Sequence, residues 1–439
     1  MAEKSSLKSF SKLTRKEKIQ VLFDYHLLNS LDKNTLKEFW FKKNKAQYNL
    51  TTISENVVSH YFLPFSIAPN FLINNQLYYI PMVTEESSVV AAASSAAKFW
   101  LSEGGFQTRV LSTTKIGQIH FNWYGSYALL QQHITTLKAA LTNSAQRFLT
   151  NMNKRGGGLK DIEFLDFTDQ LPHYYQVKIS FDTADAMGAN IINTCLESMA
   201  LALKEYFSLN FTHHEKECDI LMAILSNYTP ECLVECKLEC DIQALHSLAG
   251  HYSANQFAQR FKQAVDIASF DIYRAATHNK GIFNGIDAVL MATGNDLRAA
   301  AASGHAYAAK EGSYKGLTQI KIDLNRFVYT LQLPLAIGTV GGLTSLHPMV
   351  NIALKLLKNP SAKDLMQIAA AVGMANNFAA IRALITSGIQ YGHMKFHLHN
   401  IINSLSTNEL EKEKVLDYFE NKIVSYTDVE AYLFNLRNE

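Results

Sequence analysis

Residues 271–300 read D-I-Y-R-A-A-T-H-N-K-G-I-F-N-G-I-D-A-V-L-M-A-T-G-N-D-L-R-A-A, a mostly apolar stretch with many polar groups. Its ionisable and amide side chains include Arg274, His278, Asn279, Lys280, Asn284, Asp296 and Arg298. An ammonium such as that of Lys280 is costly to bury unless a carboxylate or a ligand compensates its charge. Asp296 is the nearest well-placed carboxylate in the sequence. We therefore expect Lys280 to be buried and to lie beside Asp296.

Two interpretations of this pair stay open on the pattern alone. A lysine held by one carboxylate keeps its proton and can face a carbonyl oxygen as a fixed positive charge, which suits reduction of a carbonyl or thioester. The alternative is a structural ion pair, because such pairs also occupy clefts.

Composition limits the class of protein. The chain of 439 residues is long enough for about two or three domains. Hydrophobic residues make up 48% and charged residues 18%, which is typical of a globular protein with a large core. The net charge of +2 gives no electrostatic case for nucleic acid as the main partner. Apolar runs such as residues 368–372 are far shorter than the ~20 residues of a membrane span, and the first residues lack the apolar core of a secretory signal. We expect a soluble cytoplasmic protein.

The cysteines are odd in number, which argues against a disulfide framework in a long cytosolic chain. They are Cys195, Cys218, Cys232, Cys236 and Cys240. The last three have a spacing of four, which would also suit a metal cluster on a helix. However, the segment E-C-L-V-E-C-K-L-E-C-D alternates apolar and polar residues with period two. This alternation predicts a half-buried strand in which cysteine serves as a small hydrophobic residue, and no metal site.

The middle of the chain predicts a small α+β unit. Strands are expected at residues 108–111, 116–121, 161–169 and 173–181, and helices at 126–150 and from about 182 to 207. This order indicates a sheet packed on helices. No G-x-G-x-x-G motif follows a strand, so the common dinucleotide-binding fold is not indicated. Gly188 is expected inside the second helix at a cost of about 1 kcal/mol, which close packing or a close ligand would justify.

Several segments together resemble class II hydroxymethylglutaryl-coenzyme A reductases, the bacterial and archaeal-type branch. The resemblance is carried by E-N-V-V-S-H-Y-F-L-P-F-S-I-A-P-N-F (55–71), E-E-S-S (85–88), D-A-M-G-A-N (185–190), T-H-N-K-G-I-F-N-G-I-D-A-V (277–289), T-G-N-D-L-R-A (293–299), L-P-L-A-I-G-T-V-G-G-L-T-S-L-H-P (333–348) and G-H-M-K-F-H (392–397). It extends over most of the chain, from about residue 10 to about residue 399. Family glycines are replaced by Ser59 and Ser66, and a family proline is replaced by Ser87.

The resemblance implies an α+β fold with a large mixed helix and strand domain, an inserted ferredoxin-like cofactor domain and a C-terminal helical flap. The expected divisions are residues 1–109 and 220–376 for the large domain, 110–219 for the cofactor domain and 377–439 for the mobile flap. Family members build the active site between two subunits, so a homodimer or a higher homo-oligomer is expected.

The resemblance also implies site residues. The catalytic set would be Glu86, Lys280, Asp296 and His393. Contacts to the substrate's carboxylate and hydroxyl groups would come from Ser88, Arg274 and Asn284. The nicotinamide cofactor segment would include Asp185, Met187, Gly188 and Asn190. From the residues alone, His393 cannot be told from His397 or His399, and Glu86 could simply favour the start of a helix through its charge.

The implied activity is reduction of 3-hydroxy-3-methylglutaryl-CoA to mevalonate and CoA with two NADH or NADPH, or the reverse reaction. Lys280 would stabilise negative charge on the carbonyl oxygen, and Asp296 would hold the lysine. Glu86 would transfer a proton to that oxygen, and His393 would protonate the departing thiolate. The alternatives are another CoA-thioester or aldehyde oxidoreductase on the same scaffold, and a non-catalytic homologue.

Overall fold

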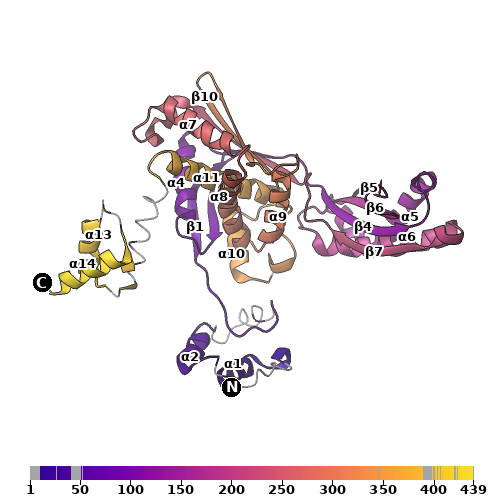
Figure 1. Cartoon of the computed structure of the whole chain (residues 1–439), viewed down its shortest axis with the longest axis horizontal. Coiled ribbons are helices and arrows are strands. Elements are labelled where there is room, and N and C mark those ends of the chain that lie inside the picture. The colour runs from indigo at the N-terminus through magenta and orange to yellow at the C-terminus, as the bar shows by residue number, and fades with distance from the viewer. Residues whose placement is uncertain are drawn as a thin grey trace.

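The computed structural model describes residues 10–25, 27–40, 51, 53–344, 346–388, 398, 401–402, 404–405, 407–419, 422 and 424–438. Within these residues the fold is α+β, as expected. A large body of helices and strands lies between a smaller sheet unit at one end and a pair of C-terminal helices at the other (Figure 1).

The large body contains a four-stranded antiparallel sheet with the order β3-β8-β10-β9. Its strands are β3 (Gln107–Val110), β8 (Leu233–Asp241), β9 (Thr318–Asp323) and β10 (Arg326–Pro334). A separate hairpin is formed by β1 (Phe65–Ile73) and β2 (Gln76–Val83).

Every second residue of β8 is buried, including Cys236 and Cys240, so the predicted half-buried strand is confirmed. Burial raises the pKa of the Cys232 thiol to about 11, which keeps it protonated and unreactive. The described residues contain no cluster of side chains suited to a metal ion.

Helices cover this sheet and form the core of the large body. They are α4 (Val89–Ser102), α7 (Ala254–Ile267), α8 (Ile272–Ala292), α9 (Leu297–Ala308), α10 (Pro348–Leu356) and α11 (Ala362–Ile385). Short 3-10 helices occur at Phe10–Lys12, His213–Lys216, Ile242–Leu248 and Gly342–Thr344. By length and composition α11 could cross a membrane, but 78% of its most apolar window is buried inside the protein, as in a core helix.

The crossing of α8 and α11 depends on small residues where the two backbones meet. A Cβ atom added to Gly285 of α8 would lie 2.6 Å from the backbone oxygen of Val372 in α11. Backbone cannot move away cheaply, so only glycine fits there. One helical turn earlier, a Cβ at Gly281 would meet its nearest neighbour, the Asn377 side chain, at an ordinary 3.6 Å.

We expect Gly285→Ala to destabilise the large body by about 1–3 kcal/mol, because overpacking outweighs the improved helix propensity of alanine. Gly281→Ala is the matched control on the same helix, and we expect it to leave stability unchanged or to raise it by up to about 1 kcal/mol. Thermal unfolding of both variants beside the parent protein provides the measurement. Equal melting temperatures for Gly285→Ala and the parent would contradict this account of the crossing.

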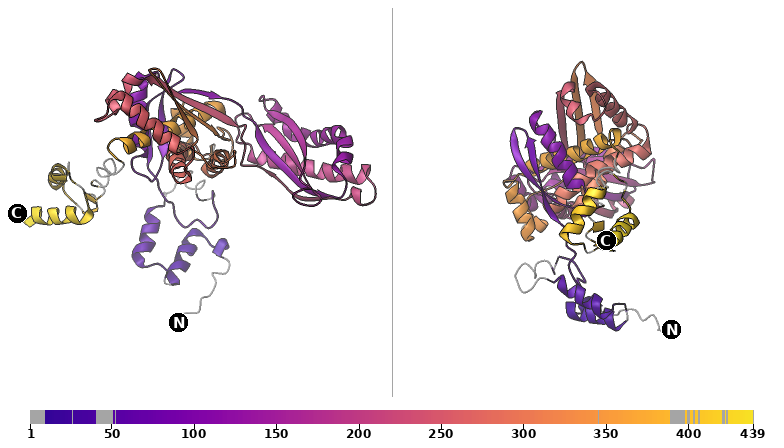
Figure 2. Two further views of the ribbon diagram at one scale, coloured as in Figure 1. Left: turned by 45° about the horizontal axis from the view of Figure 1, so that its top comes forward. Right: turned by 90° about the vertical axis from the view of Figure 1, so that its left-hand side faces the viewer.

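The smaller unit is a four-stranded antiparallel sheet with the order β5-β6-β4-β7. Its elements follow the chain as β4 (Lys115–Trp123), α5 (Tyr127–Asn153), β5 (Gly158–Asp166), β6 (Tyr174–Asp182), α6 (Ala189–Asn210) and β7 (Cys218–Leu225). This β-α-β-β-α-β order is the ferredoxin-like topology that the resemblance implied. Figure 2 shows its magenta strands with the two helices gathered on one side.

Two sequence-based details of this unit need correction. The predicted boundary between residues 219 and 220 falls inside β7, which pairs with β4, so the small sheet continues to Leu225. Gly188 does not lie inside a helix; it is the N-cap of α6 and has φ +99°. A glycine is favoured there because other residues avoid this left-handed conformation.

Helices near the two ends of the chain complete the described structure. The N-terminal pair is α1 (Arg15–Asp24) and α2 (Ser30–Glu38), and the C-terminal pair is α13 (Glu409–Phe419) and α14 (Tyr426–Asn438). The C-terminal pair has a hydrophobic cluster of its own. The boundary predicted between residues 376 and 377 falls inside α11, which continues to Ile385 as part of the large body.

Candidate active site

One polar contact of the large body joins two residues that are 194 positions apart in the sequence. Lys280 Nζ of α8 lies 2.7 Å from Glu86 Oε2, in the turn that precedes α4. The side chains of Lys280 and Glu86 are 60% and 38% exposed. The expectation that Lys280 is buried is therefore wrong for the single chain. The exposed ammonium is instead accessible to a ligand.

The turn before α4 has an uncommon backbone at Ser88. Ser88 is the N-cap of α4, but its φ of +79° lies in the left-handed region and its side chain makes no capping hydrogen bond. This conformation costs a serine of the order of 1 kcal/mol. Its hydroxyl and the N–H groups of the first helical turn stay available for an acidic group. Thr84 Oγ1 supports the turn by accepting a hydrogen bond from Glu86 N at 3.1 Å.

These residues line one cavity of about 410 Å³ between α4, α8 and α11. Its lining includes five of the residues predicted from the sequence, namely Glu86, Ser88, Arg274, Lys280 and Asn284. The cavity is large enough for part of a ligand such as an acyl group. Burial lowers the pKa of Arg274, and neither Arg274 nor Arg382, which also lines the cavity, forms an ion pair with any described residue. Two guanidinium groups without a carboxylate partner suit a substrate that carries one.

Arg382 and Asp287 were not identified from the sequence. Arg382 interrupts the apolar run A-A-I-R-A-L-I of α11, a signal that could have identified it. Asp287 follows Lys280 and Asn284 at spacings of seven and three, on the same face of α8. Burial, and to a smaller extent Glu85, raise the pKa of Asp287 to about 6.

A buried polar network holds α8 from behind the cavity. His278 Nε2 lies 2.6 Å from Thr318 Oγ1, and Asn377 Nδ2 donates to the His278 carbonyl oxygen at 2.8 Å. The Tyr329 hydroxyl donates to Asn377 Oδ1, and its oxygen lies 3.1 Å from Thr318 Oγ1. Burial and the Arg274 charge lower the pKa of His278 to about 3, so this imidazole stays neutral. The network fixes the segment of α8 that carries Lys280.

Asp296 does not lie beside Lys280 in the single chain, contrary to the prediction. Asp296 is the N-cap of α9, where its Oδ1 accepts hydrogen bonds from Arg298 N and Ala299 N at 3.0 Å each. Lys280 precedes the end of α8 by twelve residues, which corresponds to about 18 Å along the helix axis. Within the described chain Asp296 Oδ2 has no hydrogen-bond partner.

The predicted cofactor residues lie in the loop between β6 and α6 and at the start of α6. Asp185 Oδ1 accepts a hydrogen bond from Ala362 N at 2.8 Å, so its carboxylate connects the loop to the first turn of α11. Gly188 supplies no capping side chain, which leaves the first N–H groups of α6, near Asn190, without a side-chain partner. Met187 lines a small cavity. The uncapped helix start suits an anionic part of a dinucleotide.

The remaining residues singled out from the sequence are His393 and the three serines that replace family glycine or proline. His393 lies outside the described residues, as do the competing His397 and His399. Ser59, which replaces a family glycine, donates from its hydroxyl to the Leu36 carbonyl oxygen at 2.6 Å and so connects its segment to α2. Ser66 lies in β1, and Ser87 lies in the turn before α4.

Comparisons with known proteins identify relatives of this chain. The model of the family described as hydroxymethylglutaryl-coenzyme A reductase matches residues 16–398. A 3-hydroxy-3-methylglutaryl-coenzyme A reductase from Archaeoglobus fulgidus is 37% identical over 369 residues, which cover 83% of this chain and 80% of the relative. A probable enzyme of the same name from Borreliella burgdorferi is 33% identical over 416 residues, which cover 94% of this chain and 92% of the relative.

Solved structures give the same result. The class II 3-hydroxy-3-methylglutaryl-CoA reductase from Streptococcus pneumoniae, bound to NADPH in open conformations, has a TM-score of 0.71 and 38% identity. The match covers 87% of this chain and 100% of that chain. A second structure of the Streptococcus pneumoniae enzyme has a TM-score of 0.72 and 37% identity, and the match covers 98% of this chain.

Proposed function

The chain belongs to the hydroxymethylglutaryl-coenzyme A reductase family, and we propose that Glu86, Lys280 and their neighbours carry its chemistry. It is an NAD(P)H-dependent oxidoreductase that interconverts 3-hydroxy-3-methylglutaryl-CoA with mevalonate and CoA. The observation that supports the site most strongly is the Lys280–Glu86 contact of 2.7 Å at a cavity with two guanidinium groups that have no ion-pair partner among the described residues.

The cavity is suited to hold the acyl part of the substrate. Arg274 and Arg382 would bind its carboxylate, and the Ser88 hydroxyl and the Asn284 amide would bind its oxygen atoms. When bound, the reduced nicotinamide cofactor supplies hydride to the thioester carbon and then to the aldehyde carbon. The loop with Asp185, Met187 and Gly188 and the start of α6 with Asn190 are the residues that would hold this cofactor.

Lys280 and Glu86 would act on the same oxygen atom. Hydride addition leaves negative charge on the former carbonyl oxygen, and the Lys280 ammonium would stabilise that charge. Glu86, in contact with the ammonium, would deliver the proton that converts the oxyanion into a hydroxyl group. CoA leaves as a thiolate that needs a proton, and His393 is the proposed donor.

We also propose that a homodimer completes the site. Lys280 lies about 18 Å along the helix axis from the end of α8, and Asp296 follows beyond that end as the cap of α9, so Asp296 would meet the ammonium from a second copy. Asp296 Oδ2 is available for such a contact, because both bonds that cap α9 go to Oδ1. A cytoplasmic location is part of the same proposal.

Steady-state kinetics test the proposed function. Purified protein should oxidise NADH or NADPH in the presence of 3-hydroxy-3-methylglutaryl-CoA, with about two molecules of cofactor consumed for each mevalonate formed, and light scattering should report a dimer or a larger even oligomer. Turnover with other CoA thioesters but not with this one would favour the alternative oxidoreductase. Binding of the thioester without any turnover would indicate a non-catalytic homologue.

A further inference from the structure

Lys115 is an almost fully buried lysine at the start of β4, where the chain enters the small unit. Lys115 is only 3% exposed. No described carboxylate lies within ion-pair distance of its ammonium. Burial lowers its pKa, although the charges of Asp182 and Asp185 oppose this effect. A buried ammonium is costly, so its retention calls for a specific role.

The ammonium holds the loop between β6 and α6. Lys115 Nζ donates to Thr183 Oγ1 at 2.5 Å and to the Ala186 carbonyl oxygen at 3.0 Å. The Thr183 hydroxyl in turn donates to the Ala186 oxygen at 2.6 Å, and Ala186 N donates to the Thr183 carbonyl oxygen at 3.1 Å. Lys115 therefore closes a compact turn from inside.

This turn is strained and tightly packed. Ala184 has φ +50° and Gly188 has φ +99°. A Cβ at Gly188 would lie 2.4 Å from Thr183 Cγ2, so the start of α6 is packed directly against the residue that Lys115 binds. A positive φ costs alanine about 1 kcal/mol, and such a conformation persists only where its surroundings enforce it.

The other side of the same loop contacts the large body. Thr339 N donates to the Asp185 carbonyl oxygen at 2.8 Å, Ala362 N donates to Asp185 Oδ1 at 2.8 Å, and Ala186 forms a β-bridge with Val340. The loop is thus held by Lys115 from the small unit and by residues 339–362 from the large body.

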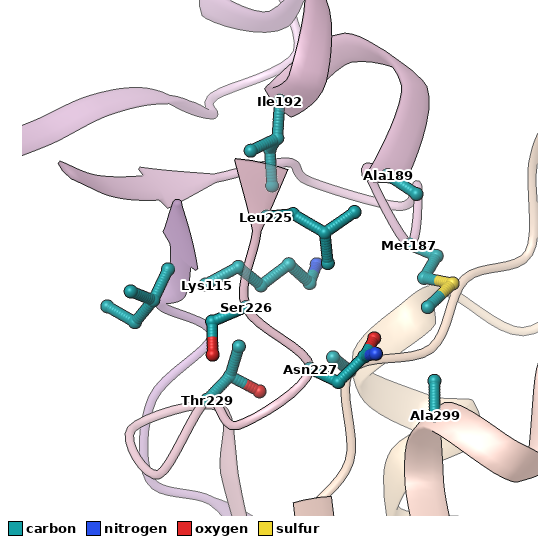
Figure 3. Close-up of a pocket in the computed structure, with 11 residues that line it drawn as sticks. Lys115, Met187, Ala189, Ile192, Leu225, Ser226, Asn227, Thr229 and Ala299 are labelled. Carbon is teal, nitrogen blue, oxygen red and sulfur yellow. The ribbon is translucent and has the colours of Figure 1, made fainter. Parts of the chain in front are cut away.

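The space beside Lys115 is too small for a substrate. Figure 3 shows the Lys115 side chain extended across a cavity, with its nitrogen directed toward the side where Met187 and Ala189 lie. The cavity volume is about 10 Å³, which is roughly enough to hold a single water molecule. Lys115 consequently cannot touch the reacting groups and can act only through the loop.

We propose that Lys115 is a positioning residue for the nicotinamide cofactor, which acts by fixing the turn from Thr183 to Gly188 and the uncapped first turn of α6. The inference rests on the proposed function, in which this loop holds the cofactor. We expect Lys115 to make no contact with the CoA thioester, because neither of its hydrogen-bond partners, Thr183 and Ala186, lines the cavity at Lys280.

The test compares cofactor and thioester parameters in Lys115→Met, which keeps the apolar stem and removes the ammonium. We expect the Kd and KM for NADH or NADPH to rise about tenfold or more, since a hydrogen bond to a charged group is lost at two acceptors. The KM for the thioester should stay within about twofold of the parent value. Lys178→Met is the matched control: it removes a positive charge from β6, where Lys178 Nζ lies 3.2 Å from Glu163 Oε1, away from the loop.

A second pair of variants decides the question if Lys115→Met does not fold. Thr183→Val removes the hydroxyl that Lys115 binds and keeps the side-chain shape, whereas Thr183→Ser keeps the hydroxyl. We expect weaker cofactor binding in Thr183→Val and near-parental binding in Thr183→Ser. If cofactor binding stays within twofold of the parent in Thr183→Val and in folded Lys115→Met, the positioning role of Lys115 is overturned, while the proposed function is unaffected. A parent protein that binds neither NADH nor NADPH would overturn the proposed function as well.

Discussion

Replacement of Lys280 by alanine is expected to lower kcat by at least about 10³-fold. The loss of one neutral oxyanion donor from an enzyme costs about 10²- to 10³-fold, and Lys280 carries a full charge. The Lys280–Glu86 ion pair should contribute little to the free energy of unfolding, because an exposed ion pair contributes at most about 1 kcal/mol. The lysine side chain is 60% exposed, so the variant should fold like the parent.

The measurement is kcat together with the dissociation constant of the CoA thioester. We expect thioester binding to remain measurable in Lys280→Ala, because Arg274 and Arg382 still line the cavity. Lys315→Ala is the control: Lys315 is also exposed and lies 2.8 Å from Glu311, but it does not line the cavity. Near-parental turnover in Lys280→Ala would remove the basis for the proposed mechanism.

Glu86→Gln is expected to lower kcat by about 10²- to 10³-fold while the thioester KM changes little. Glutamine preserves the size of the side chain and can accept the hydrogen bond from Lys280, which Glu86 Oε2 accepts at 2.7 Å. It cannot transfer a proton, and general acid catalysis typically contributes about 10²- to 10⁴-fold. The loss should therefore appear in kcat.

The adjacent acid supplies the control for this prediction. Glu85 is exposed and is not among the residues that line the cavity, so Glu85→Gln should retain kcat within about threefold. The double variant Glu86→Gln with Lys280→Ala adds a further check. If both groups act on one oxygen, its loss in kcat should be much smaller than the product of the single losses. A fully multiplicative loss would show that the two residues act independently.

Local patterns in the sequence predicted much of the fold. The period-two cysteine segment predicted β8, because alternate side chains of a strand point to opposite faces. The order of strands and helices between residues 108 and 207 predicted the small α+β unit. The assignment of β7 failed because an apolar strand at a boundary carries no local mark of the sheet that it joins.

The candidate site was predicted in part. Motif segments identified Glu86, Ser88, Arg274, Lys280 and Asn284, all of which line one cavity. The partner of Lys280 was assigned incorrectly within the chain, since proximity in sequence favoured Asp296. Lys115 was overlooked, although it shares the inward alternation of Ile119 and Phe121 in β4, which could have indicated a buried lysine.

By itself, the sequence determined the family, the fold class, the buried strand of cysteines and the residue types available for chemistry, because periodicity and motifs are properties of neighbouring residues. Tertiary structure alone decided that Glu86 meets Lys280, that Asp296 caps α9 beyond the end of α8, and that Lys115 closes the turn at Thr183. Such contacts depend on the packing of distant segments, whose relative positions no local pattern specifies.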